Sequence, residues 1–445
     1  MRGRMNVLKV LVAGVLLAGF ATAAGAAGPS GNARADAQSQ QGYQRAYGVL
    51  HAVPQYQSLD QQAGIRLFVV SINWRDWEPS LGSFSTAYID SIKKLAQGYV
   101  DAGDIVVADV GLQYPPAWVS TLTNGALKDQ NGNVARLAPN YEFSATVQAA
   151  ETTYITNVAQ TLGSRVSQYR LGLGVNGEMD FPPGASADPA GTWWIGSADT
   201  DVPAAVGANP MPGWTPGSST WNGSTVTVAD AQNWYDWYLH ALENGLTVEG
   251  NAFRDAGFTG QLALLSPGVG VLPALYKSRI NALLGNPDGA DFYGTMNTGT
   301  AYQYTIPYLI KHVRGPLIVD GTGGGDSSGA SGQINCQPGD ERVNAAPGST
   351  AMSGWSSIRW THALAAQNGL RYELENATFN SSITYVFGLF LSCHAQYLLW
   401  LNDESLEGGF RSGHVQLAYQ NSGSVDPFNE PTYASEIKRN PLPHS

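Results

Sequence analysis

The chain has 445 residues, of which only 13% are charged, and its formal net charge is -11 at pH 7. This balance provides neither the basic stripe that binds nucleic acid nor the polybasic patch that binds anionic membranes, so we expect neither partner. Twelve Trp and 21 Tyr exceed what packing usually requires, and their flat rings suit the C–H faces of sugars.

The chain begins with the pattern of a secretory signal peptide. Basic residues precede an apolar run from Val10 to Phe20, and two Ala-x-Ala arrangements follow. The apolar run is too short to anchor a protein stably in a membrane. We therefore expect residues 1–26 to be removed on export and residues 27–44, which are small and polar, to form a disordered lead-in. The mature protein should be secreted or periplasmic, without a membrane anchor.

Between residues 45 and 408, apolar runs of strand length alternate with helix-like segments. The predicted strands are Arg45–His51, Arg66–Asn73, Ile105–Gln113, Tyr169–Asn176, Gln261–Ser266, Pro316–Asp320, Gly369–Glu375 and Gln396–Asn402. The predicted helices are Ser85–Ala102, Phe143–Leu162, Ala229–Ala256, Leu272–Leu284, Met352–Asn368 and Ser381–His394.

This alternation favours a parallel sheet, and eight strand–helix units favour a single closed (β/α)8 TIM barrel. The alternative is an open doubly wound sheet, although no glycine motif for a dinucleotide or a phosphate follows any predicted strand. Long segments after the fourth and sixth strands should rise as loops on the catalytic face. Residues 409–445 look irregular and are expected to form a C-terminal tail.

A carboxylate marks the end of the fourth predicted strand. Glu178 follows the apolar, glycine-rich run 169–175 and precedes Pro182 and Pro183, where a strand ladder cannot continue. Barrel enzymes carry their chemistry at this end of the strands, so Glu178 is a candidate catalytic acid. A lone Glu in this position is more commonly a solvated acid or an ion-pair partner, and a second carboxylate is needed to decide.

The seventh predicted strand supplies that second carboxylate. Glu373 and Glu375 share one face because side chains alternate along a strand, and Glu375 is nearer to the rim. Strands four and seven lie across the barrel mouth from each other. Cleavage of a glycosidic bond needs two such carboxyl groups, one protonated to assist the leaving oxygen and one ionised to attack or to activate water. We predict Glu178 as acid/base and Glu375 as nucleophile; the alternative is that Glu373 and Glu375 only form ion pairs, for example with Arg371.

Two short motifs resemble known families. The segment Asn73–Phe84 (NWRDWEPSLGSF) resembles the second-strand signature of clan A glycoside hydrolases. The segment Tyr114–Val119 (YPPAWV), followed by Asp129–Gly132 (DQNG) and Tyr141, resembles the third-strand loop of family 42 beta-galactosidases. The order of predicted strands and helices resembles these families over roughly residues 45 to 405, whereas only the short motifs are specific. The resemblance implies hydrolysis of O-glycosidic bonds in an oligo- or polysaccharide, with retention of configuration.

Other positions are similar to beta-amylases. Clan A enzymes usually place Asn directly before the acid/base Glu, whereas Gly177 separates Asn176 from Glu178. The order Gly, Glu, hydrophobic residue and Pro, the segment 375–377 and the aromatic helix around 234–238 resemble beta-amylase segments instead. Because beta-amylases invert configuration, an inverting hydrolase is one alternative. A catalytically inactive barrel that binds carbohydrate is another.

Seven further residues fall at or near predicted strand ends or in the loops beyond them, where amides could hold sugar hydroxyls and rings could form a platform. They are Asn73, Trp74, Gln113, Tyr114, Asn176, Asn297 and Trp400. The alternative for each is a packing or loop-bonding role. The His residues show neither HExxH nor ligand spacing, so we predict no metal and no cofactor. The oligomeric state is not predicted.

The two cysteines leave their pairing open. Export permits a disulfide between Cys336 and Cys393. However, Cys336 lies in a loop expected on the catalytic face, and the helix after strand seven should carry Cys393 away from that face.

Overall fold

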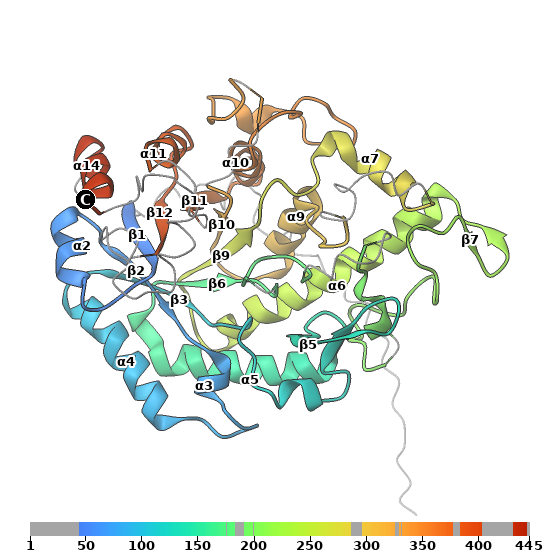
Figure 1. Cartoon of the computed structure of the whole chain (residues 1–445), viewed down its shortest axis with the longest axis horizontal. Coiled ribbons are helices and arrows are strands. Elements are labelled where there is room, and N and C mark those ends of the chain that lie inside the picture. The colour runs from blue at the N-terminus through green and yellow to red at the C-terminus, as the bar shows by residue number, and fades with distance from the viewer. Residues whose placement is uncertain are drawn as a thin grey trace, which may run out of the picture.

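The computed structural model describes residues 44–174, 176–182, 191–198, 200–285, 296–324, 329–330, 332–376, 383–402 and 430–442. Within these residues, eight parallel strands close into a barrel (Figure 1). Their order around the barrel is β1 (Ala46–His51), β2 (Leu67–Ser71), β3 (Ile105–Asp109), β6 (Gln168–Leu171), β9 (Gln261–Ser266), β10 (Leu317–Gly321), β11 (Arg371–Asn376) and β12 (Tyr397–Asn402), which pairs again with β1.

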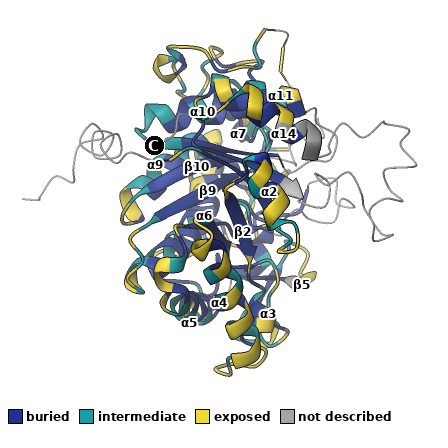
Figure 2. Ribbon diagram, turned by 90° about the vertical axis from the view of Figure 1, so that its left-hand side faces the viewer, coloured by how far each residue is buried: buried dark blue, intermediate teal, exposed yellow. Residues whose placement is uncertain are grey.

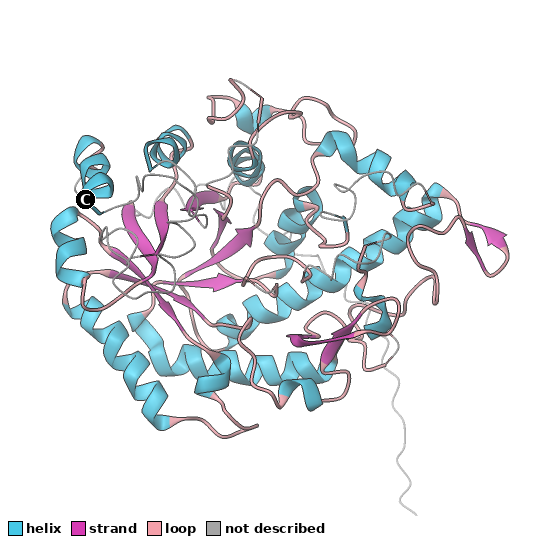
Figure 3. Cartoon of the chain, viewed as in Figure 1, coloured by secondary structure: helices cyan, strands magenta, loops and turns pink. Residues whose placement is uncertain are grey.

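Helices surround this barrel, as Figure 3 shows. They are α2 (Gln57–Ala63), α3 (Trp74–Trp77), α4 (Thr86–Asp101), α5 (Ala145–Leu162), α6 (Val228–Asp255), α7 (Pro273–Ala282), α9 (Tyr302–His312), α10 (Ser357–Gln367), α11 (Ile383–Ser392) and α14 (Glu430–Arg439). Among the residues that the structure describes, no helix is both long and apolar enough to cross a membrane. The predicted (β/α)8 barrel and its eight strands are confirmed.

Three strands end earlier than their apolar runs predicted. β3 stops at Asp109 because Gly111 takes a left-handed φ of 59°, and a Cβ there would lie 1.9 Å from the carbonyl oxygen of Ile72. β6 stops at Leu171 because Gly172 lets the chain fold back on itself; a Cβ on Gly172 would lie 2.1 Å from the carbonyl oxygen of Gly177. β2 ends at Ser71, two residues short of Asn73.

The segment expected as an irregular C-terminal tail contains helix α14. Tyr433 of this helix is fully buried, and its hydroxyl donates to the Gly48 carbonyl at 3.3 Å. Its ring lies 5.5 Å from that of Phe387 on α11 and 6.3 Å from that of Tyr47 on β1. Helix α14 therefore belongs to the outer layer of the barrel, beside α2 and α11 (Figure 1).

The barrel strands are almost entirely buried (Figure 2), but the two halves of the interior differ in chemistry. The half formed by β12, β1, β2 and β3 is mostly aliphatic; its inward side chains include Leu399, Leu50, Leu67, Val69 and Val107. The half formed by β6, β10 and β11 carries Gln168, Arg170, Asp320, Glu373 and Glu375, all buried. Burying charged groups is costly unless they are paired, so this polar half is where a functional site is expected.

Small hairpins and aromatic packing shape the long loops. β4 (Ala126–Lys128) pairs with β5 (Val134–Pro139), and β7 (Thr220–Trp221) pairs with β8 (Ser224–Thr225). Before the second hairpin, Trp193 and Trp214 meet Trp234 of α6 edge-on, with ring centroids 5.4 and 5.0 Å apart. These contacts fix the insertion that follows β6 onto α6.

Cys336 and Cys393 form a disulfide with Cα atoms 5.0 Å apart. The segment that holds Cys336 does not stay on the catalytic face but runs along the outside of α10. Arg359 in the first turn of α10 bonds Asp340 at 2.8 Å, and Gln367 at its last residue donates to the Val343 carbonyl at 2.7 Å. This path brings Cys336 next to Cys393, the residue that directly follows α11.

Candidate active site

Glu178 is placed by a tight turn beyond the end of β6. The Gly177 amide donates to the Gly174 carbonyl at 2.9 Å, and Gly177 takes a φ of 72°, which favours glycine. The chain then returns to the barrel, where the Met179 amide donates to the Leu265 carbonyl of β9 at 2.8 Å. The glycine that separates Asn176 from Glu178 thus makes the turn that presents the carboxyl group.

Two side chains hold the Glu178 carboxyl group. Thr322, which follows β10, donates from its hydroxyl to Oε1. Asn176 donates from Nδ2 to Oε2 at 3.4 Å. Burial raises the pKa of Glu178 above its ordinary value, and the negative charge of Glu375 acts in the same direction, against the lowering effect of the Thr322 hydrogen bond. This environment favours the protonated acid.

Glu375 has the opposite surroundings. It lies on β11, faces the barrel interior and is only 6% exposed. Arg170 of β6 donates from Nη2 to its Oε2, and Nη1 of the same guanidinium group lies 3.3 Å from Oδ2 of Asp320 on β10. A guanidinium at hydrogen-bonding distance favours the ionised carboxylate.

Both acids line one cavity of about 560 Å³ at the C-terminal ends of the strands. Besides Glu178 and Glu375, the walls carry amide, phenol, guanidinium and acid groups from β3, β6 and the loops after β2, β3 and β6. They are Asn73, Arg75, Asp109, Gln113, Tyr114, Arg170 and Asn176. The sequence prediction that Glu178 and Glu375 face a common space agrees with this arrangement.

Four of the seven residues predicted to bind substrate line this cavity. Gln113 lines the cavity and donates from Nε2 to Asp109 at 3.0 Å, while its Oε1 is buried without a partner. Tyr114 is 41% exposed, and its ring lies 5.8 Å from the Arg75 guanidinium carbon. Asn73 donates to Asp76 at 2.9 Å, and Asn176 contacts Glu178.

The other three predicted binding residues do not line this cavity. Trp74 is fully buried, stacks on Tyr154 with centroids 4.9 Å apart and donates to Glu78 at 3.0 Å. Trp400 is an outward residue of β12, 2% exposed, with its ring 5.7 Å from that of Tyr433. It faces the helix layer because it alternates with the inward Leu399.

Asn297 is also buried, and it donates to the Thr192 carbonyl at 3.1 Å. The backbone carbonyl of Asn297 accepts a hydrogen bond from the Tyr238 hydroxyl at 3.0 Å. Trp74, Asn297 and Trp400, predicted to bind substrate, therefore lie outside the lining of this cavity, and packing and loop bonding account for their positions.

Arg170 and Thr322 are site residues that the sequence analysis missed. Arg170 could have been found, because it is the only charged residue in its strand and shares its inward face with Gln168. Thr322 carried no such signal, since its contact with Glu178 spans 144 positions of the chain. Arg371, suggested as a partner of the strand-seven acids, instead donates to Gln396 at 2.6 Å.

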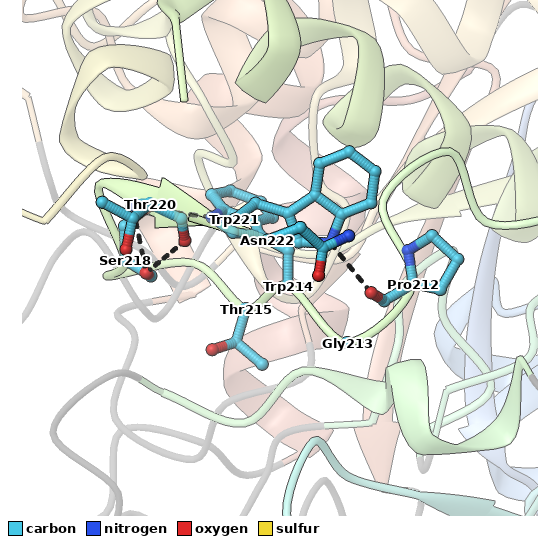
Figure 4. A pocket seen from close by; sticks show the side chains of 8 residues that line it. All are labelled: Pro212, Gly213, Trp214, Thr215, Ser218, Thr220, Trp221 and Asn222. Atoms are coloured by element: carbon cyan, nitrogen blue, oxygen red, sulfur yellow. Dashed lines mark hydrogen bonds between the residues drawn. The ribbon is translucent and has the colours of Figure 1, made fainter. Parts of the chain in front are cut away.

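A second cavity, of about 210 Å³, lies beside the β7–β8 hairpin (Figure 4). Trp221 closes one side of it, held by a bond of 2.9 Å from its indole N–H to the Pro212 carbonyl. The residues that line it, all of which the structure describes, include no acid or base. The chemistry predicted for the chain therefore belongs to the larger cavity.

No protein-family profile matches the sequence, and a comparison with curated proteins finds no match. Solved structures do resemble the fold. The catalytic domain of the beta-amylase from Paenibacillus polymyxa aligns with a TM-score of 0.58 and 15% identity, over 89% of this chain and 98% of that domain. The beta-galactosidase from the psychrophilic Marinomonas ef1 aligns with a TM-score of 0.48 and 12% identity, over 80% of this chain and 53% of that one.

The fold is therefore a (β/α)8 TIM barrel, which this chain shares with that beta-amylase domain. The more specific likeness to family 42 beta-galactosidases stays a prediction.

Proposed function

We propose that this chain is a glycoside hydrolase that cleaves O-glycosidic bonds of an oligo- or polysaccharide, with Glu178 and Glu375 as its catalytic residues. One observation carries the proposal. Two carboxyl groups, from the ends of strands four and seven of the barrel, line one cavity in opposite electrostatic settings. Such a division lets one acid be protonated while its neighbour is ionised.

The roles follow from these settings. Glu178, whose pKa is raised by burial, donates its proton to the glycosidic oxygen as the bond from that oxygen to the anomeric carbon breaks. Glu375, paired with Arg170, supplies the negative charge that either attacks the anomeric carbon or accepts a proton from the attacking water. Gln113 and Tyr114 line the cavity, where they are in place to bind the sugar through an amide group and an aromatic face.

The stereochemical outcome separates two versions of this proposal. The clan A motifs led us to expect retention, with Glu375 as nucleophile. Inversion, with Glu375 activating water, is the second candidate. The structure aligns with 98% of a beta-amylase domain, and beta-amylases invert configuration. Proton NMR of the anomer first released from a defined substrate distinguishes them.

We further propose that the enzyme acts outside the cytoplasm. The predicted signal peptide lies outside the described residues, and so does the lead-in up to residue 43. Support comes from the Cys336–Cys393 disulfide, since such bonds persist mainly in oxidising compartments. Subcellular fractionation of the expressing cells, with N-terminal sequencing of the mature protein, tests this.

The function itself is tested by screening the purified protein against a panel of polysaccharides for release of reducing sugar. We expect release by the wild type and almost none by Glu178→Gln and Glu375→Gln. A wild type that binds a polysaccharide without cleaving it would support the inactive carbohydrate-binding barrel instead. Undiminished cleavage by both variants would remove the carboxyl pair from the mechanism.

A further inference from the structure

Beneath Glu375, buried polar groups form a chain of contacts across the barrel interior. Gln168 of β6 donates to Glu373 Oε1 at 2.7 Å. Glu373 lies beside Asp320, Asp320 contacts Arg170, and Arg170 bonds Glu375. Asp320 and Glu373 are fully buried. The chain of contacts thus ends on the carboxylate proposed to carry the chemistry.

Asp320 and Glu373 are direct partners in the pairing of β10 with β11. Each has one oxygen that accepts a bond, from Arg170 or from Gln168, and one buried oxygen without a partner, Asp320 Oδ1 and Glu373 Oε2. The two carboxyl groups are within hydrogen-bonding reach of each other. Two neighbouring buried carboxylates cannot both ionise cheaply, and one proton between them would satisfy both oxygens.

The surrounding charges favour such a proton. Arg170 is the one cation that contacts these acids within the described part of the interior, and it also interacts electrostatically with Asp109 of β3. Glu375 adds further negative charge. Beside the pair, β12 contributes the phenol Tyr397 and β9 the apolar Leu265. Burial raises the pKa of both Asp320 and Glu373, and for Asp320 the charge of Glu373 adds to this.

We propose that Asp320 and Glu373 share one proton, and that this acid pair acts through Arg170 to position Glu375. With one proton, the pair carries a single negative charge, which holds one edge of the guanidinium while the other edge serves Glu375. Without the shared proton, Asp320 and Glu373 would be two adjacent anions that compete with Glu375 for Arg170. Asp320 and Glu373 are positioning residues, and their effect on catalysis rests on the function proposed above.

Infrared difference spectroscopy of the full folded protein in D2O tests the shared proton. At neutral pH, Asp320→Asn and Glu373→Gln should each remove one carbonyl stretch of a protonated carboxyl group, because the new amide N–H replaces that proton. The double variant should remove no more than either single one. As a control, Glu142→Gln removes a separate buried carboxyl group. The double variant Glu142→Gln/Glu373→Gln should therefore lose two carbonyl stretches, one for each substitution. Loss of two bands in the Asp320→Asn/Glu373→Gln double variant, or of none in either single variant, overturns the proposal.

Kinetics test the positioning role. The amide variants should keep kcat within a few-fold of the wild type, because the hydrogen bond survives. Asp320→Ala and Glu373→Ala should lower kcat on the order of 100-fold with little change in KM, because Arg170 and Glu375 lose their placement. Alanine variants that are less stable but retain wild-type kcat in the folded fraction overturn positioning. A wild type that shows the shared proton but cleaves no glycoside overturns the proposed function and leaves the acid pair standing.

Discussion

At the scale of single residues, Glu178 and Glu375 are the same amino acid made chemically different by their neighbours. Burial raises the pKa of Glu178 against the lowering effect of its hydrogen bonds from Thr322 and Asn176, whereas Glu375 is held by a guanidinium group. The sequence places both acids at strand ends but cannot show this division. It arises from the burial of Glu178 and from Arg170, which reaches Glu375 from another strand of the closed barrel.

Glu178→Gln should therefore be a leaving-group-dependent variant. We expect kcat/KM to fall by about 10²–10⁴-fold on natural glycosides, which need a proton on the departing oxygen, and much less on activated aryl glycosides. Steady-state kinetics on the two substrate types measure this. Glu341→Gln makes the same chemical change at an exposed acid and should leave both rates unchanged. Equal losses on the two substrate types would remove Glu178 from the role of acid.

Gln113 lines the cavity and should contribute to binding through its side-chain amide. Gln113→Ala should raise KM by about three- to tenfold, the effect of one neutral hydrogen bond, while kcat changes less. Gln97→Ala on helix α4 is the matched change outside the cavity and should leave KM as it is. An unchanged KM in Gln113→Ala would mean that the side-chain amide does not meet the substrate.

At the scale of elements, the sequence predicts the eight strands well because each apolar run is a local signal. Side-chain direction also follows from the sequence: Glu373 and Glu375 were correctly given one face. The same alternation, applied to β12, would have turned Trp400 outward with Leu398. Strand ends and loops were harder, because a turn such as the one at Gly177 depends on what the chain meets beyond the strand.

Tyr114 and Trp400 should separate binding from packing. Tyr114→Ala should raise KM and leave the free energy of unfolding nearly unchanged, because the ring is exposed at the cavity. Trp400→Ala should lower the free energy of unfolding by about 3–5 kcal/mol, because it empties a buried site against Tyr433. Chemical denaturation and steady-state kinetics on both variants give the comparison. The reverse pattern would restore Trp400 as a binding residue.

The disulfide ties two elements of the outer layer together. It closes a separation of 57 residues, so on the chain-entropy estimate the double variant Cys336→Ser/Cys393→Ser should lose about 4 kcal/mol of unfolding free energy. Thiol titration of the wild type under denaturing conditions should find no free thiol. A reductant should destabilise the wild type but not the double variant. Two titratable thiols in protein isolated from its native compartment would disprove the bond in solution.

At the scale of the whole molecule, buried carboxyl groups outside the catalytic cavity set the response to pH. Glu142, Glu151 and Glu249 are fully buried, and among the side chains described no cation pairs with them. Burial raises the pKa of Glu142 from 4.5 to about 8, and it raises those of Glu151 and Glu249 well above 4.5, with further increases from neighbouring acids. Each of these groups therefore releases its proton less readily in the folded protein than in the unfolded chain.

This determines the sign of the pH dependence. An acid with a raised folded pKa stabilises the fold fully below its unfolded pKa, and this contribution is lost as pH rises through the folded value. Glu142 releases its proton near pH 4.5 in the unfolded chain and only near pH 8 in the folded protein, so the free energy of unfolding should fall across that window; the raised pKa values of Glu151 and Glu249 act in the same direction. Each such group contributes about 1.4 kcal/mol per pH unit. The lowered pKa values of Asp201 and Asp230 oppose this only below their ordinary value of 3.8.

We therefore expect the protein to be most stable in mild acid and to lose stability steadily from about pH 5 to pH 8. Denaturant unfolding at a series of pH values, at constant ionic strength, measures the slope. Glu142→Gln keeps the shape of the side chain and removes its titration, so its slope should be shallower by the contribution of one group. Asp255→Asn, at an exposed acid, should leave the slope unchanged. A free energy of unfolding that rises with pH across this window would show that the buried acids ionise inside the fold with compensating partners.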